Sequence, residues 1–271
     1  MSLNEDFLTM YFGFNNEIIR EDVAPPLLWQ HLRNIPPMFI NEIFVAASKV
    51  TFWQLHYEYF YRVADKLNIL LPEFFVAYED FIRRLVNRNK FFNGAVTQIL
   101  FYPYQDEMAF LAFPKKTGYR KFEVDYDNFQ SIKLVENETV VDDNWAFVIK
   151  NDLHNYIYKK QPLFYLKNSY IIGTQYFGVV AIKGNIIYSP TWNSGFKFNP
   201  LQLAVNDILQ GRDYEIKDQP IPVDFIAEAD ELWLVDRVYG ILNRVGWEKH
   251  RYYISDLASE IIDEVNSLVF K

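Results

Sequence analysis

The sequence contains no cysteine, which excludes disulfide bonds, thiolate metal ligands and cysteine nucleophiles. Only 10 of its 271 residues are glycine, and none of them stands in a glycine-rich phosphate loop. The chain lacks the run of roughly 20 apolar residues that a membrane-spanning helix needs. Its N-terminus also lacks the basic start and apolar stretch of a signal peptide. Together these absences predict a cytoplasmic protein that does not insert into membranes.

Residue types used in metal binding and nucleophilic catalysis are sparse or scattered. No two of the four histidines have the spacing of metal ligands, and no serine lies in a nucleophile-elbow motif. The formal net charge of -8 disfavours a nucleic-acid-binding surface, which is normally basic. We therefore expect no metal site and no nucleic-acid partner.

Apolar and aromatic residues are abundant. Hydrophobic residues make up 50% of the chain and aromatic residues 18%, which predicts a globular protein with a sizeable core. The length fits one large domain or two smaller ones. Residues 114–118 (PKKTG) separate two strand-rich blocks and are the best candidate for a linker.

Residues 178–211 carry the clearest local pattern in the chain. Gly184-Asn185 joins two short apolar runs and predicts a tight hairpin. Asn199 and Pro200 are typical of a helix start, and Gly211 is typical of a helix end. A helix start directed out of a loop offers N–H groups to an anion. An ordinary capped helix explains the same residues.

Periodic patterns predict the elements that flank this stretch. Apolar residues spaced four apart predict helices over 55–67 and 74–85, and β-rich runs predict strands within 10–20, 39–46, 96–102 and 108–113. A hairpin over 163–172, a helix over 223–228, a strand over 231–235 and a final helix over 257–268 are predicted further on. The mixture indicates an α+β or α/β fold in two lobes.

Lys150 is the residue best suited to covalent chemistry. It ends the apolar run 146–149, and a lysine desolvated there would have a lowered pKa and a neutral amine for Schiff-base formation. A lysine that simply extends past a strand end into solvent fits the pattern as well.

Three longer passages carry a family resemblance. INEIFVAASKVTFWQLHYEYFYRVADKLNI (40–69) has the character of a strand, a turn and a histidine-containing helix. GVVAIKGNIIYSP, followed by SGFKFNPLQLAVNDIL, has that of a hairpin and a capped helix. PIPVDFIAEADELWLVDRVYGILNRV (220–245) has that of a helix, an "EADE" strand and a loop. In this order they resemble the class IV aminotransferases, the fold-type IV pyridoxal phosphate enzymes that include branched-chain and D-amino acid aminotransferases and aminodeoxychorismate lyase.

The resemblance implies a two-domain α+β fold like that of D-amino acid aminotransferase. A small N-terminal α/β domain would span 1–113 and a larger C-terminal α/β domain 119–271, joined by 114–118. It further implies pyridoxal 5'-phosphate as cofactor, an amino acid-like substrate and a homodimer.

The chemistry that the family needs maps partly onto this chain. Lys150 matches the Schiff-base lysine, which would also move the substrate's α-proton as general acid and base. The family's glutamate keeps the cofactor ring nitrogen protonated so that the ring can accept electrons, and its position falls on Gly173. The small residues that follow that glutamate become Gln175, Tyr176 and Phe177.

The implied phosphate-binding positions are altered as well. The family's helix arginine falls on Tyr59, and its Thr/Ser-Ala loop falls on Arg237-Val238-Tyr239. Its Gly-Ile-Thr helix start falls on Asn199-Pro200-Leu201, where the proline removes one N–H donor. A phosphate carries about two negative charges and needs several charge-assisted donors.

Two main hypotheses follow. The chain is an aminotransferase or an aminodeoxychorismate-lyase-like enzyme with an altered cofactor site, or it is a cofactor-free, inactive relative. In the second case a cleft lined by Tyr59, Tyr176, Phe177 and Arg237 would bind another ligand or a partner. A purely structural role is a third alternative.

Overall fold

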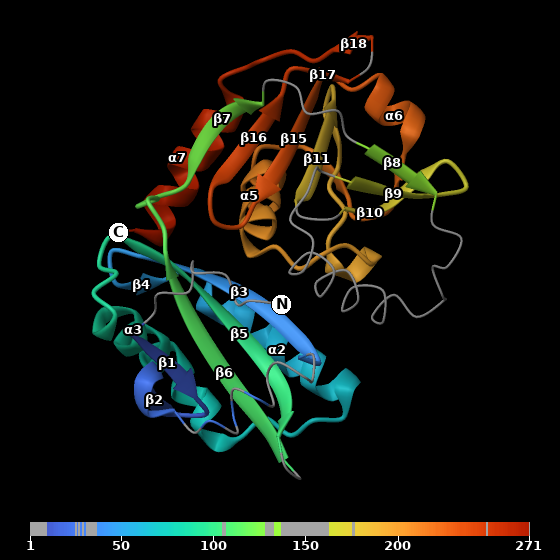
Figure 1. Ribbon diagram of the computed structural model, residues 1–271. Helices are drawn as coiled ribbons and strands as arrows, with labels where there is room; N and C mark the ends of the chain where they lie inside the picture. The colour runs from blue at the N-terminus through green and yellow to red at the C-terminus, as the bar shows by residue number, and fades with distance from the viewer. Residues whose placement is uncertain are drawn as a thin grey trace. The chain divides into compact units, whose positions relative to one another are not determined.

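The structure is a computed structural model, and its chain folds as two compact units (Figure 1). The N-terminal unit is Met1–Arg120 and the C-terminal unit is Lys121–Lys271. The described residues are 10–24, 26, 28, 30, 37–104, 107–127, 133–136, 163–174, 177–247 and 249–270. Residues 114–116, which the sequence placed in a linker, pair with residues 95–97 of a neighbouring strand.

The N-terminal unit contains a six-stranded antiparallel sheet in the order β2-β1-β6-β5-β3-β4. Its strands are β1 (Tyr11–Phe14), β2 (Glu17–Arg20), β3 (Phe39–Ala46), β4 (Lys49–Val50), β5 (Gly94–Tyr104) and β6 (Glu107–Lys116). The unit also contains two α-helices, α2 (Trp53–Leu67) and α3 (Tyr78–Arg88). Two short 3₁₀ helices accompany them: η1 (Glu21–Val23) follows β2, and η2 (Glu73–Ala77) lies between α2 and α3.

An aromatic core lies between this sheet and its helices. Phe39 and Phe101 are directly opposite each other on β3 and β5, so their rings share one face of the sheet. Phe60 of α2 contacts both rings, at centroid distances of 5.9 and 5.7 Å. Phe75 of η2 contacts Phe60 at 5.1 Å. The abundance of aromatic residues in the sequence therefore serves core packing here.

The C-terminal unit contains a six-stranded mixed sheet, β13-β12-β11-β15-β16-β7, and a four-stranded sheet, β14-β10-β9-β8. The strands of the first are β7 (Glu123–Asp127), β11 (Gly178–Lys183), β12 (Ile186–Tyr188), β13 (Glu215–Lys217), β15 (Glu231–Asp236) and β16 (Gly240–Arg244). Those of the second are β8 (Lys133–Glu136), β9 (Leu163–Lys167), β10 (Tyr170–Thr174) and β14 (Ile221–Pro222). The two-residue strands β17 (Gly246–Trp247) and β18 (His250–Arg251) form a hairpin.

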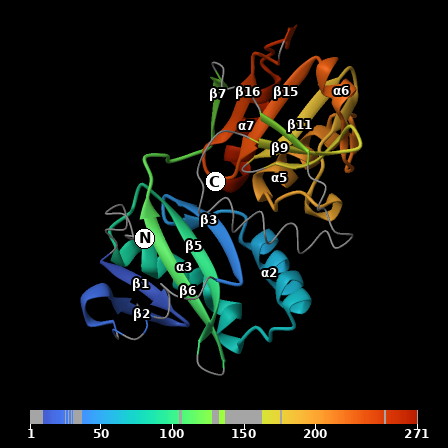
Figure 2. The ribbon, with the colours of Figure 1, turned by 45° about the vertical axis from the view of Figure 1, so that its right-hand side comes forward.

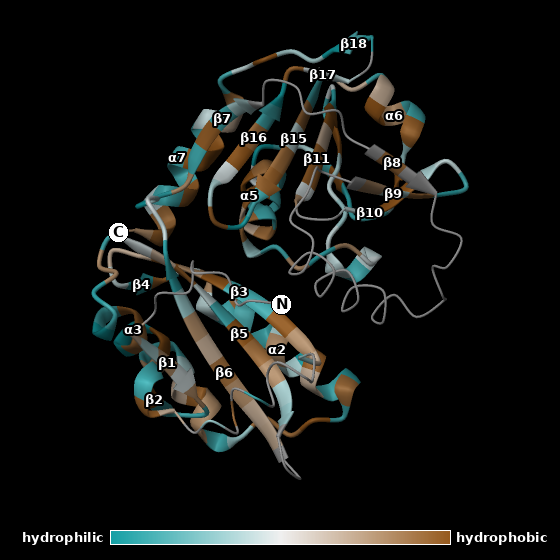
Figure 3. Ribbon diagram, in the orientation of Figure 1, coloured by the Kyte–Doolittle hydropathy of each residue, from teal (hydrophilic) through white to brown (hydrophobic). Residues whose placement is uncertain are grey.

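Helices complete the C-terminal unit. They are η3 (Trp192–Ser194), α5 (Pro200–Gly211), α6 (Val223–Ala227) and α7 (Leu257–Val269). α5 contacts β15 and α7 contacts β7 and β16, so both helices cover the six-stranded sheet (Figures 1 and 2). Strands β11 and β15 are predominantly hydrophobic along their length (Figure 3) because they are buried on both faces.

Most of the predicted elements lie where the sequence placed them. The hairpins at 10–20, 163–172 and 178–188, the helices at 55–67, 200–211 and 257–268, and the strand at 231–235 are confirmed. The final helix begins at Leu257, and Ser255 rather than Asp256 supplies its capping oxygen. The apolar run at 146–149 lies outside the described residues.

Among the described residues, no helix is long and apolar enough to cross a membrane. The same residues contain no group of histidine, aspartate and glutamate side chains that could hold a metal ion.

Two buried tyrosines differ in their hydrogen bonding, and this difference predicts opposite effects of removing the hydroxyl. Burial raises the pKa of both phenols. The Tyr78 hydroxyl has no hydrogen-bond partner among the described residues, whereas the Tyr252 hydroxyl donates to the Ile226 carbonyl at 3.0 Å. Tyr78→Phe should therefore stabilise the protein by about 1 kcal/mol, and Tyr252→Phe should destabilise it by about 1 kcal/mol. Denaturant unfolding measures the change in the free energy of unfolding for each variant. Changes of the same sign in both variants would contradict the difference in hydrogen bonding.

Candidate functional site

The start of α5 is closed by the side chain of its own capping residue. Asn199 has extended backbone angles, and its Oδ1 accepts the N–H of Gln202 at 3.2 Å. Its Nδ2 donates to the carbonyl of Val235, at the end of β15, at 2.7 Å. Asn199 is only 4% exposed, so these bonds satisfy a buried amide and also join the helix to the sheet.

Few backbone donors remain at this helix start. Pro200 occupies the first helical position and has no N–H. The N–H groups of Gln202 and Leu203 bond to the side chain and the carbonyl of Asn199. The N–H of Leu201, between Pro200 and Gln202, is the remaining donor of this first turn, and Leu201 is fully buried. The ordinary capped helix that the sequence allowed accounts for the N–H groups of Gln202 and Leu203. Cofactor binding by Asn199 and Leu201, which the resemblance implied, stays a prediction.

The side chain of Gln202 forms a second set of hydrogen bonds, next to the Asn199 cap. Its Nε2 lies 2.8 Å from Ser189 Oγ, 3.0 Å from the Val179 carbonyl and 3.1 Å from the Pro190 carbonyl. Ser189 Oγ in turn donates to Asn206 Oδ1 at 2.7 Å. These contacts join α5 to β11 and to the segment that follows β12.

In the turn between β15 and β16, two backbone N–H groups also bond to a side chain of the same turn. Asp236 Oδ1 accepts the N–H groups of Val238 and Tyr239, at 2.8 and 2.9 Å. A carboxylate therefore occupies these two backbone donors. Arg237, in the same turn, is 7% exposed. The resemblance assigned cofactor binding to Arg237 and Val238, and that assignment stays a prediction.

A third polar cluster fixes the segment that leads to α5. Asp218 accepts from both the N–H and the hydroxyl of Thr191, at 2.7 and 2.6 Å, and from the Ser194 hydroxyl at 2.5 Å. Thr191 is also the side-chain cap of η3. Since all three bonds go to one carboxylate, this segment is held independently of any ligand.

The other predicted site residues belong to other elements or lie outside the described residues. Tyr59 is in α2 of the N-terminal unit, 1% exposed, and its ring lies 5.6 Å from that of Phe39. Gly173 is in β10 opposite Tyr165, next to an irregularity in the strand pairing. Phe177 packs against the C-terminal unit's core. Lys150, Gln175 and Tyr176 lie outside the described residues.

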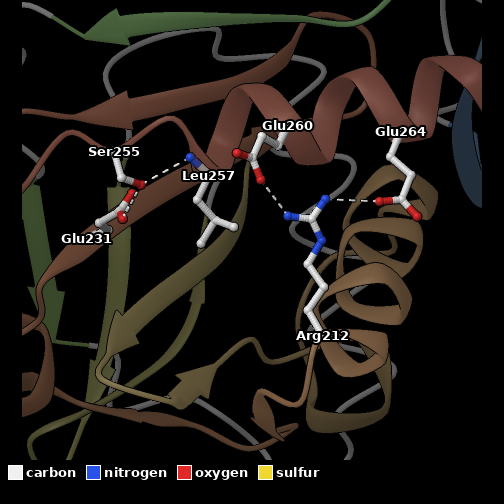
Figure 4. Close-up of polar contacts among 6 residues, drawn as sticks. All are labelled: Arg212, Glu231, Ser255, Leu257, Glu260 and Glu264. Atoms are coloured by element: carbon white, nitrogen blue, oxygen red, sulfur yellow. Dashed lines mark hydrogen bonds and ion pairs between the residues drawn. The ribbon is translucent and has the colours of Figure 1, made fainter.

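The "EADE" strand has a structural role that the sequence did not reveal. Glu231 is 7% exposed, and its two carboxylate oxygens accept from Trp233 Nε1 at 3.0 Å and from Ser255 Oγ at 2.6 Å. Ser255 Oγ also accepts the N–H of Leu257, the first residue of α7 (Figure 4). A buried carboxylate in the sheet thus holds the start of α7.

Sequence reasoning missed Gln202, Asp236, Asp218 and Glu231. One signal was available for Gln202, because Asn199, Gln202 and Asn206 recur at helical spacing within an apolar helix. Asp236 also had a local signal, because an aspartate commonly accepts the N–H groups two and three residues further on in a turn. Asp218 and Glu231 bond to Thr191 and Ser255, which lie 27 and 24 residues away, so these contacts required the fold.

Comparison with known proteins identifies the fold. No protein-family model matches the sequence, and no curated protein matches it. A branched-chain aminotransferase from Thermoproteus uzoniensis, determined with norvaline, is similar over 94% of this chain and 93% of its own, with a TM-score of 0.73 and 12% identity. The branched-chain amino acid aminotransferase from Escherichia coli has a TM-score of 0.70 and 14% identity over 93% of this chain and 92% of its own. A putative 4-amino-4-deoxychorismate lyase from Legionella pneumophila has a TM-score of 0.62 and 14% identity over 84% of this chain and 90% of its own.

The chain therefore has the fold of the fold-type IV pyridoxal phosphate enzymes, as the sequence predicted. At 12–14% identity this likeness concerns the fold.

Several described residues differ from those that the resemblance assigns to pyridoxal phosphate binding. Gly173 has no carboxylate to face a ring nitrogen, and Tyr59 has no charge to offer a phosphate. Pro200, the Asn199 cap and the Asp236 carboxylate remove or occupy backbone donors at the two remaining positions.

The two polar links to α7 should differ in strength. Ser255→Ala removes both the bond to buried Glu231 and the cap on Leu257, so it should cost about 1–2 kcal/mol. Arg212 pairs with Glu260 at 2.7 Å and with Glu264 at 3.1 Å (Figure 4), but both glutamates are largely exposed. Arg212→Ala should therefore cost less than about 1 kcal/mol. Thermal unfolding of both variants measures the difference, and a larger loss for Arg212→Ala would contradict this ranking.

Proposed function

We propose that this protein is a cofactor-independent relative of the class IV aminotransferases that binds a ligand without transforming it. The Asp236 carboxylate carries this proposal, because it accepts the N–H groups of Val238 and Tyr239 in the turn that the resemblance matches to the family's phosphate loop. The capped, proline-containing start of α5 supports the same conclusion. The ligand class proposed is a small amino acid-like molecule, since the similar enzyme from Thermoproteus uzoniensis was determined with norvaline.

A second candidate is a pyridoxal phosphate-dependent aminotransferase or an aminodeoxychorismate-lyase-like enzyme. Its support is the fold, which is shared with a branched-chain aminotransferase determined with pyridoxamine 5'-phosphate. Lys150 would be its catalytic residue by resemblance, and Arg237 would be a cation in the turn after β15. A homodimer and a cytoplasmic location are carried over from the resemblance under either candidate.

Covalent trapping with borohydride separates the two candidates. The purified chain is incubated with pyridoxal phosphate, reduced, digested and mapped by mass spectrometry. We expect scattered, substoichiometric labelling of exposed lysines, because Lys150 has no anchored cofactor with which to react. Lys183→Ala is the matched control, since Lys183 is a partly exposed lysine that pairs with Glu228.

Stoichiometric labelling of Lys150, with an absorbance band near the violet edge of the visible spectrum that Lys150→Ala removes and Lys183→Ala keeps, would contradict the proposal. It would instead establish the second candidate.

A further inference from the structure

A polar pair interrupts an apolar face of the sheet in the N-terminal unit. Glu42 of β3 and Gln98 of β5 lie directly opposite each other, so their side chains share one face of the sheet. Gln98 Nε2 donates to Glu42 Oε1 at 2.9 Å. The pairs before and after them on the same face are apolar, Ile40 with Leu100 and Phe44 with Val96. Glu42 and Gln98 are therefore an isolated polar pair among hydrophobic neighbours.

The side-chain amide of Gln98 is satisfied at only one end. A carboxylate offers only acceptors, so the amide nitrogen faces Glu42 and the amide oxygen is directed away from it. That oxygen, Oε1, is buried and has no hydrogen-bond partner among the described residues, and Gln98 is only 8% exposed. Burying an acceptor without a donor is unfavourable, so such an oxygen is a candidate contact for a ligand.

One cation of the chain lies on the same face of the sheet. Lys115 of β6 is opposite Val96, one pair along from Gln98, but within the described chain no donor, Lys115 included, bonds to Gln98 Oε1. Phe113 of β6 is the residue directly opposite Gln98, and its ring stacks on that of Phe12 at a centroid distance of 5.6 Å. Gln98 therefore lies between a residue with a carboxylate and a residue with an aromatic ring.

These three groups favour a positively charged donor. An amide oxygen and a carboxylate both accept N–H bonds, and a carboxylate and the face of an aromatic ring both attract positive charge. Apolar neighbours screen charge weakly, so this attraction is stronger here than in water. An ammonium group combines three N–H donors with one positive charge. Glu42 is partly exposed, so the pair reaches solvent through its carboxylate.

We propose that Glu42 and Gln98 bind the ammonium group of an amino acid-like ligand. Gln98 Oε1 accepts one N–H of that group, and Glu42 holds the Gln98 amide in place and contributes negative charge. The ligand class rests on the proposed function. The two side chains do not, because both belong to the N-terminal unit and neither is a position that the resemblance assigns to pyridoxal phosphate binding.

Thermal unfolding of the full chain with butylammonium chloride tests the site. This probe carries the ammonium group without a carboxylate, and sodium chloride of equal ionic strength corrects for general salt effects. We expect a saturable rise in the melting temperature. Gln98→Met removes the amide oxygen at similar volume and should weaken binding at least about tenfold. Glu42→Gln removes the negative charge and should weaken binding as well.

A second pair of the same residue types provides the matched control. Gln54 Nε2 donates to Glu58 Oε1 at 3.1 Å on α2, but this pair is exposed. Gln54→Met should leave the binding of butylammonium unchanged. The inference would be overturned if butylammonium had no saturable effect on the wild-type protein, if Gln98→Met left that effect intact, or if Gln54→Met weakened it equally.

Norvaline and pentanoate, which lacks only the amino group, separate this inference from the proposed function. We expect norvaline to bind more tightly than pentanoate, and Gln98→Met to remove the difference. Binding of butylammonium through Gln98 without any binding of norvaline would refute the proposed ligand class and retain the site. Binding of norvaline that is equally tight in the wild-type protein and in Gln98→Met would refute the site and retain the proposed ligand class.

Discussion

Satisfying the buried amide of Gln202 is the constraint on which the candidate site depends. That single side chain is almost fully enclosed, and its Nε2 lies within 3.1 Å of three oxygens on two neighbouring segments. Losing these partners would leave a polar group buried and unsatisfied, which costs more than one ordinary hydrogen bond contributes. The hairpin β11–β12 and the start of α5 are therefore held in one arrangement, and the absence of a side chain at Gly178 makes that arrangement possible.

The same principle acts in the turn between β15 and β16. Backbone N–H groups that point out of a turn attract anions, and in this chain Asp236 provides the anion itself. The fold does not depend on these positions, because its core consists of apolar strands such as β11 and β15 and the aromatic residues of the N-terminal unit. A fold shared at 12% identity with a branched-chain aminotransferase can thus persist while the residues of its turns differ.

Local chemistry explains which features the sequence could predict. Asn199 caps α5 through a bond three residues along the chain and Pro200 occupies its first position, so the start of this helix was predictable from the sequence. Gly211 is its last residue, as the sequence predicted. Gln202 reaches Val179 across 23 positions, and Ser255 reaches Glu231 across 24, so both contacts required the fold. Tyr59 shows a further limit: the resemblance gave its position in the helix, but the aromatic core decided its environment. Lys150 lies outside the described residues, so its role as catalytic lysine stays a prediction.

The central claim is that the chain's own side chains occupy the places where a phosphate group would be held. Phosphorus-31 nuclear magnetic resonance of pyridoxal phosphate mixed with the protein tests this claim most directly, because the nucleus observed is the one that needs the missing donors. We predict a single sharp resonance at the position of the unbound cofactor. A second, broadened and shifted resonance that grows with protein concentration would contradict the account.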